Sequence, residues 1–199
     1  MGLHHPATRR RFLLASAATG LGSSMTDLAW SATELPATPA CDAHGAATLA
    51  QTEGPFFKPR SPERADLIEP GMKGRPIELV GYVLTPACKP LAHALLDLWH
   101  ADDEGGYDTT GFRLRGHQFT DAAGRYRFRT ILPALYTGRT RHFHVKVQVE
   151  GGRVLTTQLY FPNEPTNRRD GLFRKELLMR VAQAGDALDA RFDFVLDQR

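Results

Sequence analysis

The sequence predicts an all-β protein, folded as an antiparallel two-sheet β-sandwich. Short segments alternate apolar and polar residues, turn residues separate them roughly every ten positions, and the chain has 199 residues of which 42% are hydrophobic. That length and composition suit one domain with its own core. The expected strands cover, in order, residues 77–84, 95–99, 116–120, 125–131, 142–149, 154–161 and 192–196.

Turn signals justify the ends of these strands. The first strand ends at Thr85-Pro86, residues 121–124 read Asp-Ala-Ala-Gly, and residues 150–152 read Glu-Gly-Gly. Within residues 125–131, tyrosine, phenylalanine and threonine alternate with arginines. A period of two is typical of a strand that is buried on one face.

Two regions outside the strands predict other structure. Residues 32–74 are rich in Pro, Ser, Thr and Gly, so we expect an extended N-terminal arm lying on the domain, with an aromatic turn at residues 52–57. Residues 169–184 predict a short helix near the C-terminus, because apolar residues recur there at helical spacing. These apolar residues are Leu172, Phe173, Leu177, Leu178 and Val181.

The N-terminus predicts an export signal over residues 1–31. Arg9, Arg10 and Arg11 precede Phe12 and a short, mildly apolar Ala/Gly-rich stretch, a pattern typical of the bacterial twin-arginine signal. The alternative is a basic amphipathic helix, and the apolar stretch is too short for a membrane span. We therefore expect a periplasmic protein with a signal over 1–31, the arm over 32–74 and the sandwich domain over 75–199.

Two cysteines, Cys41 and Cys88, are present. An even count in an exported chain favours a disulfide, which would join the arm to the loop after the first strand. A lipid anchor on Cys41 is the alternative, but the preceding Thr-Pro-Ala makes a poor lipobox.

The overall charge gives no reason to expect nucleic acid or a membrane surface as a partner. The formal net charge of +3 comes from 25 Lys and Arg against 22 Asp and Glu. Removing residues 1–31 takes away three arginines and Asp27, leaving 25 − 3 = 22 basic and 22 − 1 = 21 acidic residues. A nearly neutral chain carries no strong electrostatic steering.

Residues 142–149 contain the densest group of chemically active side chains. Side chains two positions apart on a strand project from the same face, so His142 and His144 can both reach one metal ion. For an isolated His-x-His, however, a polar surface face is the commoner explanation. The expected core face is Phe143, Val145, Val147 and Val149, and the opposite face is His142, His144, Lys146 and Gln148.

Tyrosines could complete a metal site. Tyr136 lies six residues before His142, and Tyr107 lies in a loop flanked by glycine and acidic residues. The alternative for both is ordinary aromatic packing. Residue type alone does not single out Tyr107 from the other tyrosines, which are Tyr82, Tyr126 and Tyr160.

Five segments, which span about residues 50 to 165, form a recognisable pattern. They are Thr-Glu-Gly-Pro-Phe-Phe at 52–57, Asp-Leu-Trp-His-Ala-Asp at 97–102 with Gly106-Tyr107, Thr-Ile-Leu-Pro at 130–133 with Tyr136, Gly-Arg-Thr-Arg-His-Phe-His at 138–144, and Thr-Gln-Leu-Tyr-Phe at 157–161. In this order and spacing they resemble the intradiol ring-cleavage dioxygenases, of the protocatechuate 3,4-dioxygenase-like kind. The signal and the two cysteines resemble the exported twin-arginine branch of that family.

This resemblance implies a non-haem iron(III) site that opens a catechol-type aromatic diol with O2 to a cis,cis-muconate-type diacid. The implied ligands are Tyr107, Tyr136, His142 and His144. Two tyrosinates and one hydroxide would neutralise a ferric ion, and a bound cation favours the phenolate form of tyrosine. The histidines would add neutral nitrogen donors, and they need outer partners to fix their tautomers.

The resemblance also implies catalytic roles. The substrate would displace Tyr136, which would take up one of its protons. Arg139 would stabilise negative charge that develops on the ring, and Gln158 would orient the substrate. The alternatives are a surface arginine and an ordinary polar residue of a strand.

Three positions depart from the family pattern without removing a ligand. His100 stands where many relatives have glutamine, Phe57 where tyrosine is frequent, and Thr137 where proline is common. Because pocket walls set substrate choice, the resemblance leaves the particular catechol open. The expected wall positions are Leu135, Phe56, Phe57 and residues 103–108.

Two other functions fit parts of the sequence. A transthyretin-like binding module without catalysis would share the sandwich. A hydrolase would bind zinc through histidine, but zinc rarely takes tyrosine ligands. Iron content separates the three hypotheses. The helical dimerisation domain of the catechol-specific branch is not seen in this sequence, so the oligomeric state stays open.

Overall fold

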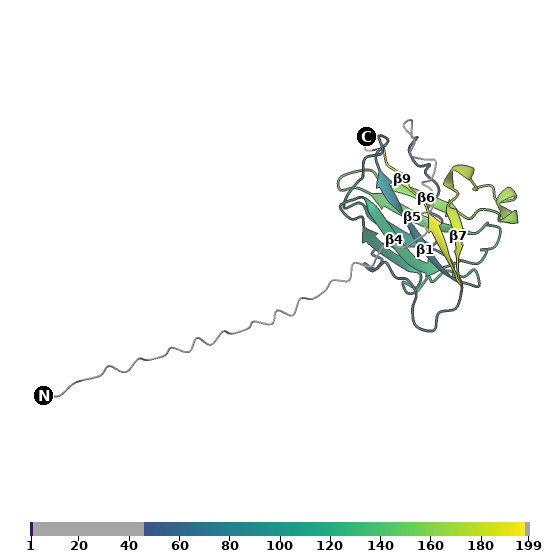
Figure 1. The fold of residues 1–199 in the computed structure, drawn as a ribbon. Helices are drawn as coiled ribbons and strands as arrows, with labels where there is room; N and C mark the ends of the chain where they lie inside the picture. The colour runs from purple at the N-terminus through teal and green to yellow at the C-terminus, as the bar shows by residue number, and fades with distance from the viewer. Residues whose placement is uncertain (2–45, 198–199) are drawn as a thin grey trace. The chain divides into compact units, whose positions relative to one another are not determined.

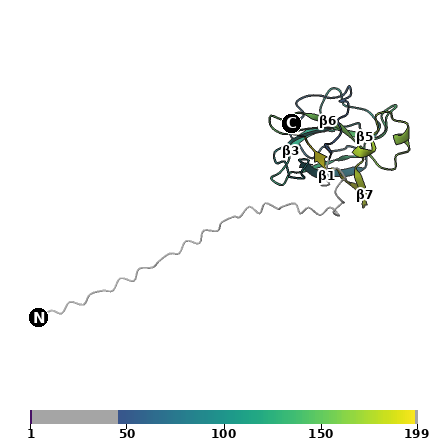
Figure 2. The same ribbon diagram turned by 90° about the horizontal axis from the view of Figure 1, so that it is seen from above.

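The computed structural model describes Met1 and residues 46–197. Within this part, nine strands form two sheets (Figures 1 and 2). One sheet has the order β4-β1-β8-β7, with β9 also pairing with β1, and the other has the order β3-β2-β5-β6. The strands are β1 Pro76–Leu84, β2 Leu95–Trp99, β3 Arg115–Phe119, β4 Arg125–Ile131, β5 His142–Gln148, β6 Leu155–Tyr160, β7 Arg180–Ala184, β8 Ala187–Arg191 and β9 Phe194–Val195.

The prediction of an all-β sandwich is confirmed, with one difference in strand direction. All pairs are antiparallel except that β8 and β9 run parallel to β1. The parallel pairs arise because the chain leaves β6, forms the β7–β8 hairpin and returns beside the first strand. β2 and β4 have the predicted bounds, and the other five expected strands differ by one or two residues at their ends.

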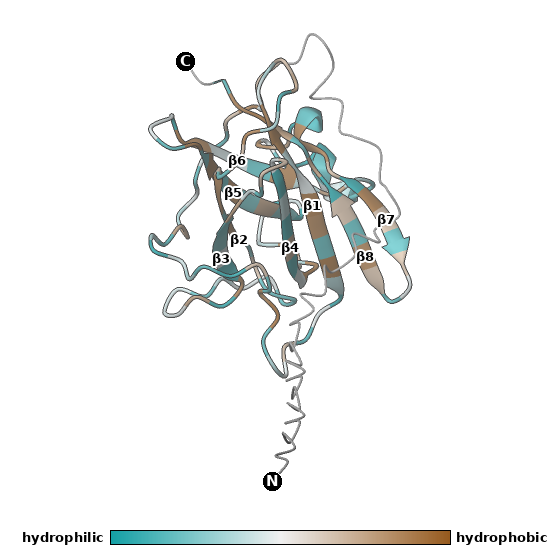
Figure 3. Ribbon diagram, turned by 60° about the vertical axis from the view of Figure 1, so that its left-hand side comes forward, coloured by the Kyte–Doolittle hydropathy of each residue, from teal (hydrophilic) through white to brown (hydrophobic). Residues whose placement is uncertain are grey.

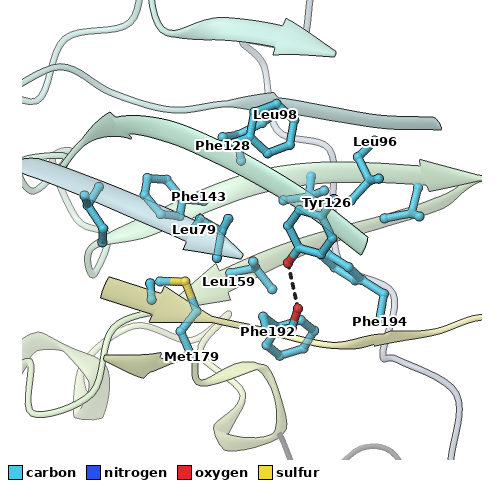
Figure 4. Packing of buried hydrophobic residues seen from close by; sticks show 14 of the residues in the cluster. Leu79, Leu96, Leu98, Tyr126, Phe128, Phe143, Leu159, Met179, Phe192 and Phe194 are labelled. Carbon is cyan, nitrogen blue, oxygen red and sulfur yellow. Dashed lines mark hydrogen bonds between the residues drawn. The ribbon is translucent and has the colours of Figure 1, made fainter. Parts of the chain in front are cut away.

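The core lies between the two sheets, where residues from both meet (Figure 4). Leu79 and Phe128 come from one sheet, Phe143 and Leu159 from the other, and all four are 0% exposed. The alternation that predicted the strands is visible as bands of opposite hydropathy along β1 (Figure 3). The buried Tyr126 hydroxyl donates to the Phe192 carbonyl at 2.6 Å (Figure 4), which satisfies a polar group that would otherwise destabilise the core.

The predicted helix over residues 169–184 is wrong. This region contains two 3-10 turns, η1 at Pro165–Arg168 and η2 at Lys175–Leu177, followed by strand β7. β7 pairs with β8 across a turn at Gly185, whose φ is +61°. The helical spacing of apolar residues reflects separate tertiary contacts instead, since Phe173 packs edge-on against Tyr160 and Leu178 forms a bridge with the same residue.

The described part of the arm lies along the second sheet. The Gln51 amide donates to the Thr156 carbonyl at 2.8 Å, and the Arg64 amide donates to the His117 carbonyl at 2.9 Å. Further along, the arm reaches β4 of the first sheet, where the Leu67 amide donates to the Arg129 carbonyl at 2.8 Å. Between these points Gly54 lies against His144 and Phe57 lies on Trp99, so the arm covers the side of β3-β2-β5-β6 that faces away from the core.

Several expectations concern residues outside the described part. The export signal over 1–31 falls there except for Met1, and so does Cys41, so its pairing with Cys88 stays a prediction. The three-part division of the chain likewise stays a prediction. Among the described residues, no helix is long and apolar enough to cross a membrane.

Candidate metal centre

Strand β5 brings its two histidines to one point. The Nε2 atoms of His142 and His144 lie 3.1 Å apart. The Tyr107 hydroxyl lies 3.3 Å from the first and 3.1 Å from the second. Both histidines are almost fully buried, with 4% and 3% exposure. Three of the four predicted ligands therefore converge, although they come from a strand and a distant loop.

The backbone fixes the tautomer of His142. Its Nδ1–H donates to the Thr140 carbonyl at 2.6 Å, so the lone pair of its Nε2 points at the cluster. Burial lowers the pKa of His142 to about 4 and lowers the pKa of His144 well below its ordinary value. Both rings are therefore neutral near pH 7 and can donate nitrogen lone pairs.

His144 is held between a stacked aromatic ring and a glycine of the arm. Trp99 stacks on His144 with ring centroids 5.0 Å apart and an interplanar angle of 7°. On the arm, a Cβ placed on Gly54 would lie 3.2 Å from Cε1 of His144. The φ of Gly54 is +74°, a backbone conformation that favours glycine. Nδ1 of His144 is buried without a hydrogen-bond partner among the described residues.

The loop that carries Tyr107 is shaped by two aspartates. The carboxylate of Asp102 accepts from the amides of Glu104 and Gly106, and that of Asp108 accepts from the amides of Thr110, Gly111 and Arg113. The ring of Phe56 stacks on Tyr107 at 4.3 Å and 12°. Burial raises the pKa of the Tyr107 hydroxyl above its ordinary value, so without a cation this side chain stays a phenol.

Tyr136 lies beside the cluster. Its ring meets Tyr107 edge-on at 5.7 Å and Phe56 edge-on at 5.4 Å. In the described part of the chain, no hydrogen bond joins its hydroxyl to either histidine. The structure therefore places Tyr136 next to the other three candidates without bringing it into the same hydrogen-bonded group.

Two of the three predicted catalytic residues, Arg139 and Gln158, contact each other. Nη2 of Arg139 donates to Oε1 of Gln158 at 2.6 Å, and Nε2 of Gln158 donates to the Thr52 carbonyl at 2.9 Å. Gln158 is 0% exposed, and its strand position is paired with His144. Arg139 also forms an ion pair with Asp170 at 2.9 Å. The alternative of a surface arginine is wrong for Arg139.

The donor set fits a hard metal ion. Atoms bonded to one ion at about 2.1 Å and at right angles to each other lie about 3 Å apart, and the three observed distances are 3.1, 3.1 and 3.3 Å. Fe(III) favours anionic oxygen ligands, so two neutral histidine nitrogens and the Tyr107 oxygen in its phenolate form would suit this ion. Within the described residues, no three His, Cys, Asp or Glu side chains form a metal-binding group, so a site here depends on tyrosine.

Other predicted residues lie at the edges of this cluster. His100 is buried, donates from Nδ1 to the Ala101 carbonyl and accepts from the Thr130 hydroxyl, each at 2.7 Å. These two hydrogen bonds of His100 connect the end of β2, where the loop of Tyr107 begins, with β4. Phe57 packs on Trp99, while Leu135 and Thr137 are exposed near Tyr136. An open pocket of about 340 Å³ is lined by Asp102, Gly106, Tyr107, Asp108, Arg113 and Leu114.

Sequence reasoning missed three supporting residues. Asp170 holds Arg139, the Thr140 carbonyl orients His142, and Trp99 stacks on His144. Trp99 lies opposite His144 because β5 pairs with β2, a register that spacing within one strand does not reveal. Asp170 lay in a region predicted as helix, so no sequence signal connected it to Arg139.

Comparisons with known proteins show which family the chain resembles. A family model described as "Dioxygenase" matches residues 52–198. Hydroxyquinol 1,2-dioxygenase of Nocardioides simplex is 31% identical over 189 residues, covering 83% of this chain and 61% of that protein. Catechol 1,2-dioxygenase 1 of Acinetobacter lwoffii is 32% identical, covering 65% of this chain and 51% of that protein. The chain thus spans between half and two thirds of the length of these relatives.

Solved structures give the same family. The dioxygenase domain of a dioxygenase and carbohydrate-binding protein fusion from the cellulolytic bacterium Streptomyces sp. SirexAA-E is 55% identical, with a TM-score of 0.76, covering 77% of this chain and 100% of that domain. 3-Chlorocatechol 1,2-dioxygenase from Rhodococcus opacus 1CP is 29% identical with a TM-score of 0.69, covering 74% and 72%. The chain belongs to the intradiol ring-cleavage dioxygenase family.

Proposed function

We propose that this protein is a non-haem iron(III)-dependent dioxygenase that cleaves a catechol-type diol between its two hydroxylated carbons. The observation that carries the proposal is the convergence of the Tyr107 hydroxyl and the two histidine Nε2 atoms within 3.1 to 3.3 Å. Both oxygen atoms of O2 enter the product, a cis,cis-muconate-type diacid. The reaction therefore balances without an external reductant.

The ligands of the ferric ion would be His142, His144, Tyr107 and Tyr136. When bound, the ion supplies a Lewis acid and an electron acceptor for the two diol oxygens. The histidines are neutral because they are buried. Burial raises the pKa of Tyr107, and a cation held there would favour the phenolate form of its side chain.

The remaining residues handle protons and orientation. Tyr136 lies at the edge of the cluster, where in its phenolate form it would accept one proton of the diol. Arg139 is held by Asp170 and Gln158, so its cation is preorganised beside the position where negative charge develops. The amide of Gln158 is fixed by Thr52 and orients the substrate. Phe56 and the Tyr107 ring form an apolar wall that excludes water.

The names of relatives support a catechol-type substrate. They include hydroxyquinol, catechol, protocatechuate and chlorocatechol dioxygenases. We further propose that residues 1–31 direct the protein to the periplasm by the twin-arginine route and that Cys41 and Cys88 form a disulfide there. The support for both is the sequence pattern alone.

The visible spectrum of iron-loaded protein tests the proposed function. Tyrosinate-to-iron(III) charge transfer should give a reddish protein, and an air-free catechol solution should change that band. Admission of air should then produce the diacid. A protein that stays colourless after iron loading would favour the transthyretin-like binding module and contradict the enzyme.

A further inference from the structure

The buried carboxylate of Asp170 receives three hydrogen bonds. One oxygen accepts from Nε of Arg139 at 2.9 Å and from the Thr140 amide at 2.8 Å. The other oxygen accepts from the Leu172 amide at 2.9 Å. The aspartate side chain is only 3% exposed, and that of Arg139 is 18% exposed. A buried carboxylate with three donors makes charge-assisted hydrogen bonds of defined geometry. A solvent-exposed ion pair is held much less firmly.

These bonds orient the guanidinium of Arg139. Its Nε–H is bonded to Asp170, and one Nη2–H is bonded to Gln158 at 2.6 Å. The two partners use two of the five N–H groups of the arginine. A long side chain held from two sides loses the rotamer freedom that it would have if it were held from one side.

The same carboxylate connects Arg139 with His142. The Thr140 amide donates to Asp170, and the Thr140 carbonyl accepts from Nδ1 of His142 at 2.6 Å. The Thr140 hydroxyl is bonded to Asn167 at 2.6 Å and lies 2.9 Å from the Thr166 hydroxyl, both in η1. The peptide just before β5 is therefore fixed by the loop that contains Asp170.

We propose that Asp170 is a positioning residue for ring opening, which holds the Arg139 cation toward the bound diol. The inference rests on the proposed function, because it concerns the same site. Asp170 does not touch the substrate, and its effect on the reaction passes through Arg139. Asparagine cannot replace it, since an amide has one acceptor oxygen whereas three donors face this carboxylate.

The test compares Asp170→Asn with a matched control, Glu164→Gln. Glu164 pairs with Nε of Arg141 at 2.7 Å, the two side chains being 22% and 20% exposed. The control thus removes a carboxylate–arginine pair next to the same loop without touching Arg139. We expect Asp170→Asn to lower kcat roughly 10- to 100-fold, with smaller changes in KM for catechol. Its iron content and charge-transfer band should match those of the wild type, because Asn167 and Thr166 still hold Thr140 through its hydroxyl. Glu164→Gln should keep the wild-type kcat.

A double-mutant cycle decides whether the effect passes through Arg139. In an Arg139→Ala background, Asp170→Asn should lower kcat by less than about threefold further, because residues that act as one unit are not additive. If the wild type is active but Asp170→Asn keeps the wild-type kcat, this inference is overturned and the proposed function stands. The same holds if the kcat losses of Asp170→Asn and Arg139→Ala multiply fully in the double variant. An inactive wild type would overturn the proposed function as well.

A second variant keeps the test decisive if Asp170→Asn does not fold. Arg139→Lys keeps the positive charge but cannot bond to Asp170 and Gln158 through a planar fork. If orientation matters, its kcat should fall nearly as far as that of Arg139→Ala. A kcat equal to that of the wild type would mean that the charge alone is sufficient, and positioning by Asp170 would be refuted.

Discussion

Replacing Gly54 with alanine should weaken iron binding at the candidate metal centre, although Gly54 is not itself a predicted ligand. Gly54 has φ +74°, and a Cβ there would lie 3.2 Å from Cε1 of His144. Alanine in the left-handed conformation costs about 1–2 kcal/mol, and a stiffer unfolded chain offsets about 0.4–1 kcal/mol of this. The net loss from the backbone is therefore about 1 kcal/mol.

The contact with His144 adds a second effect. Trp99 stacks on this ring at 5.0 Å, so the ring cannot move away from Gly54 without losing that contact. A shift of a few tenths of an ångström exceeds the tolerance of a metal bond, which is about 0.2 Å. We expect iron affinity to fall about 10- to 100-fold, as for other changes around metal ligands.

Gly151→Ala is the matched control. Gly151 has φ +69° and nothing within 4 Å of an added Cβ, so it shares the backbone strain and lacks the contact. Urea unfolding should show a similar loss of stability in both variants, about 1 kcal/mol. Iron titration followed by the charge-transfer band should separate them. Equal iron affinity in the two variants would refute the reasoning that the arm holds His144 in place.

Two further predictions concern the ligands and a buried histidine. Tyr107→Phe and His142→Ala should each deplete iron and abolish ring opening, while Tyr82→Phe should leave both unchanged; full activity in either ligand variant would refute the assignment. Burial lowers the pKa of His100 to about 4 from an ordinary 6.5, so the unfolded state takes up this proton first as pH falls, and stability is lost between pH 6.5 and 4. His100→Gln should reduce the loss in the free energy of unfolding between pH 7 and pH 5 by about 2 kcal/mol, as measured by urea unfolding. An unchanged pH dependence would show that the buried His100 does not cause this loss.

Local patterns were sufficient for most strands. β2 and β4 have the predicted bounds, because alternation and turn residues act over a few positions. The β7–β8 hairpin was missed, although Gly185-Asp186 is a hairpin signal between two short apolar segments. The helical spacing of apolar residues before this hairpin was misleading, because Phe173 and Leu178 make separate tertiary contacts with Tyr160 instead of forming one face of a helix.

The site depends on register, which the sequence shows only weakly. His144 is paired with Trp99 on one side and Gln158 on the other, and Trp99 is paired with Arg115. These residues form one row across four strands, although they lie far apart in the chain. Turn geometry and pairing fix such a row, whereas spacing within one strand predicts only that His142 and His144 share a face.

The arm explains why the polar face of β5 became a site. Alternation distinguishes two faces but does not say whether the polar one meets water. Here Gly54 lies against His144, Phe57 lies on Trp99, and the Thr52 carbonyl holds Gln158. The histidines are consequently buried and neutral, and at such a buried position a fixed cation and a phenolate would act strongly on each other. A segment without regular secondary structure thus turns an ordinary polar strand face into a candidate metal centre.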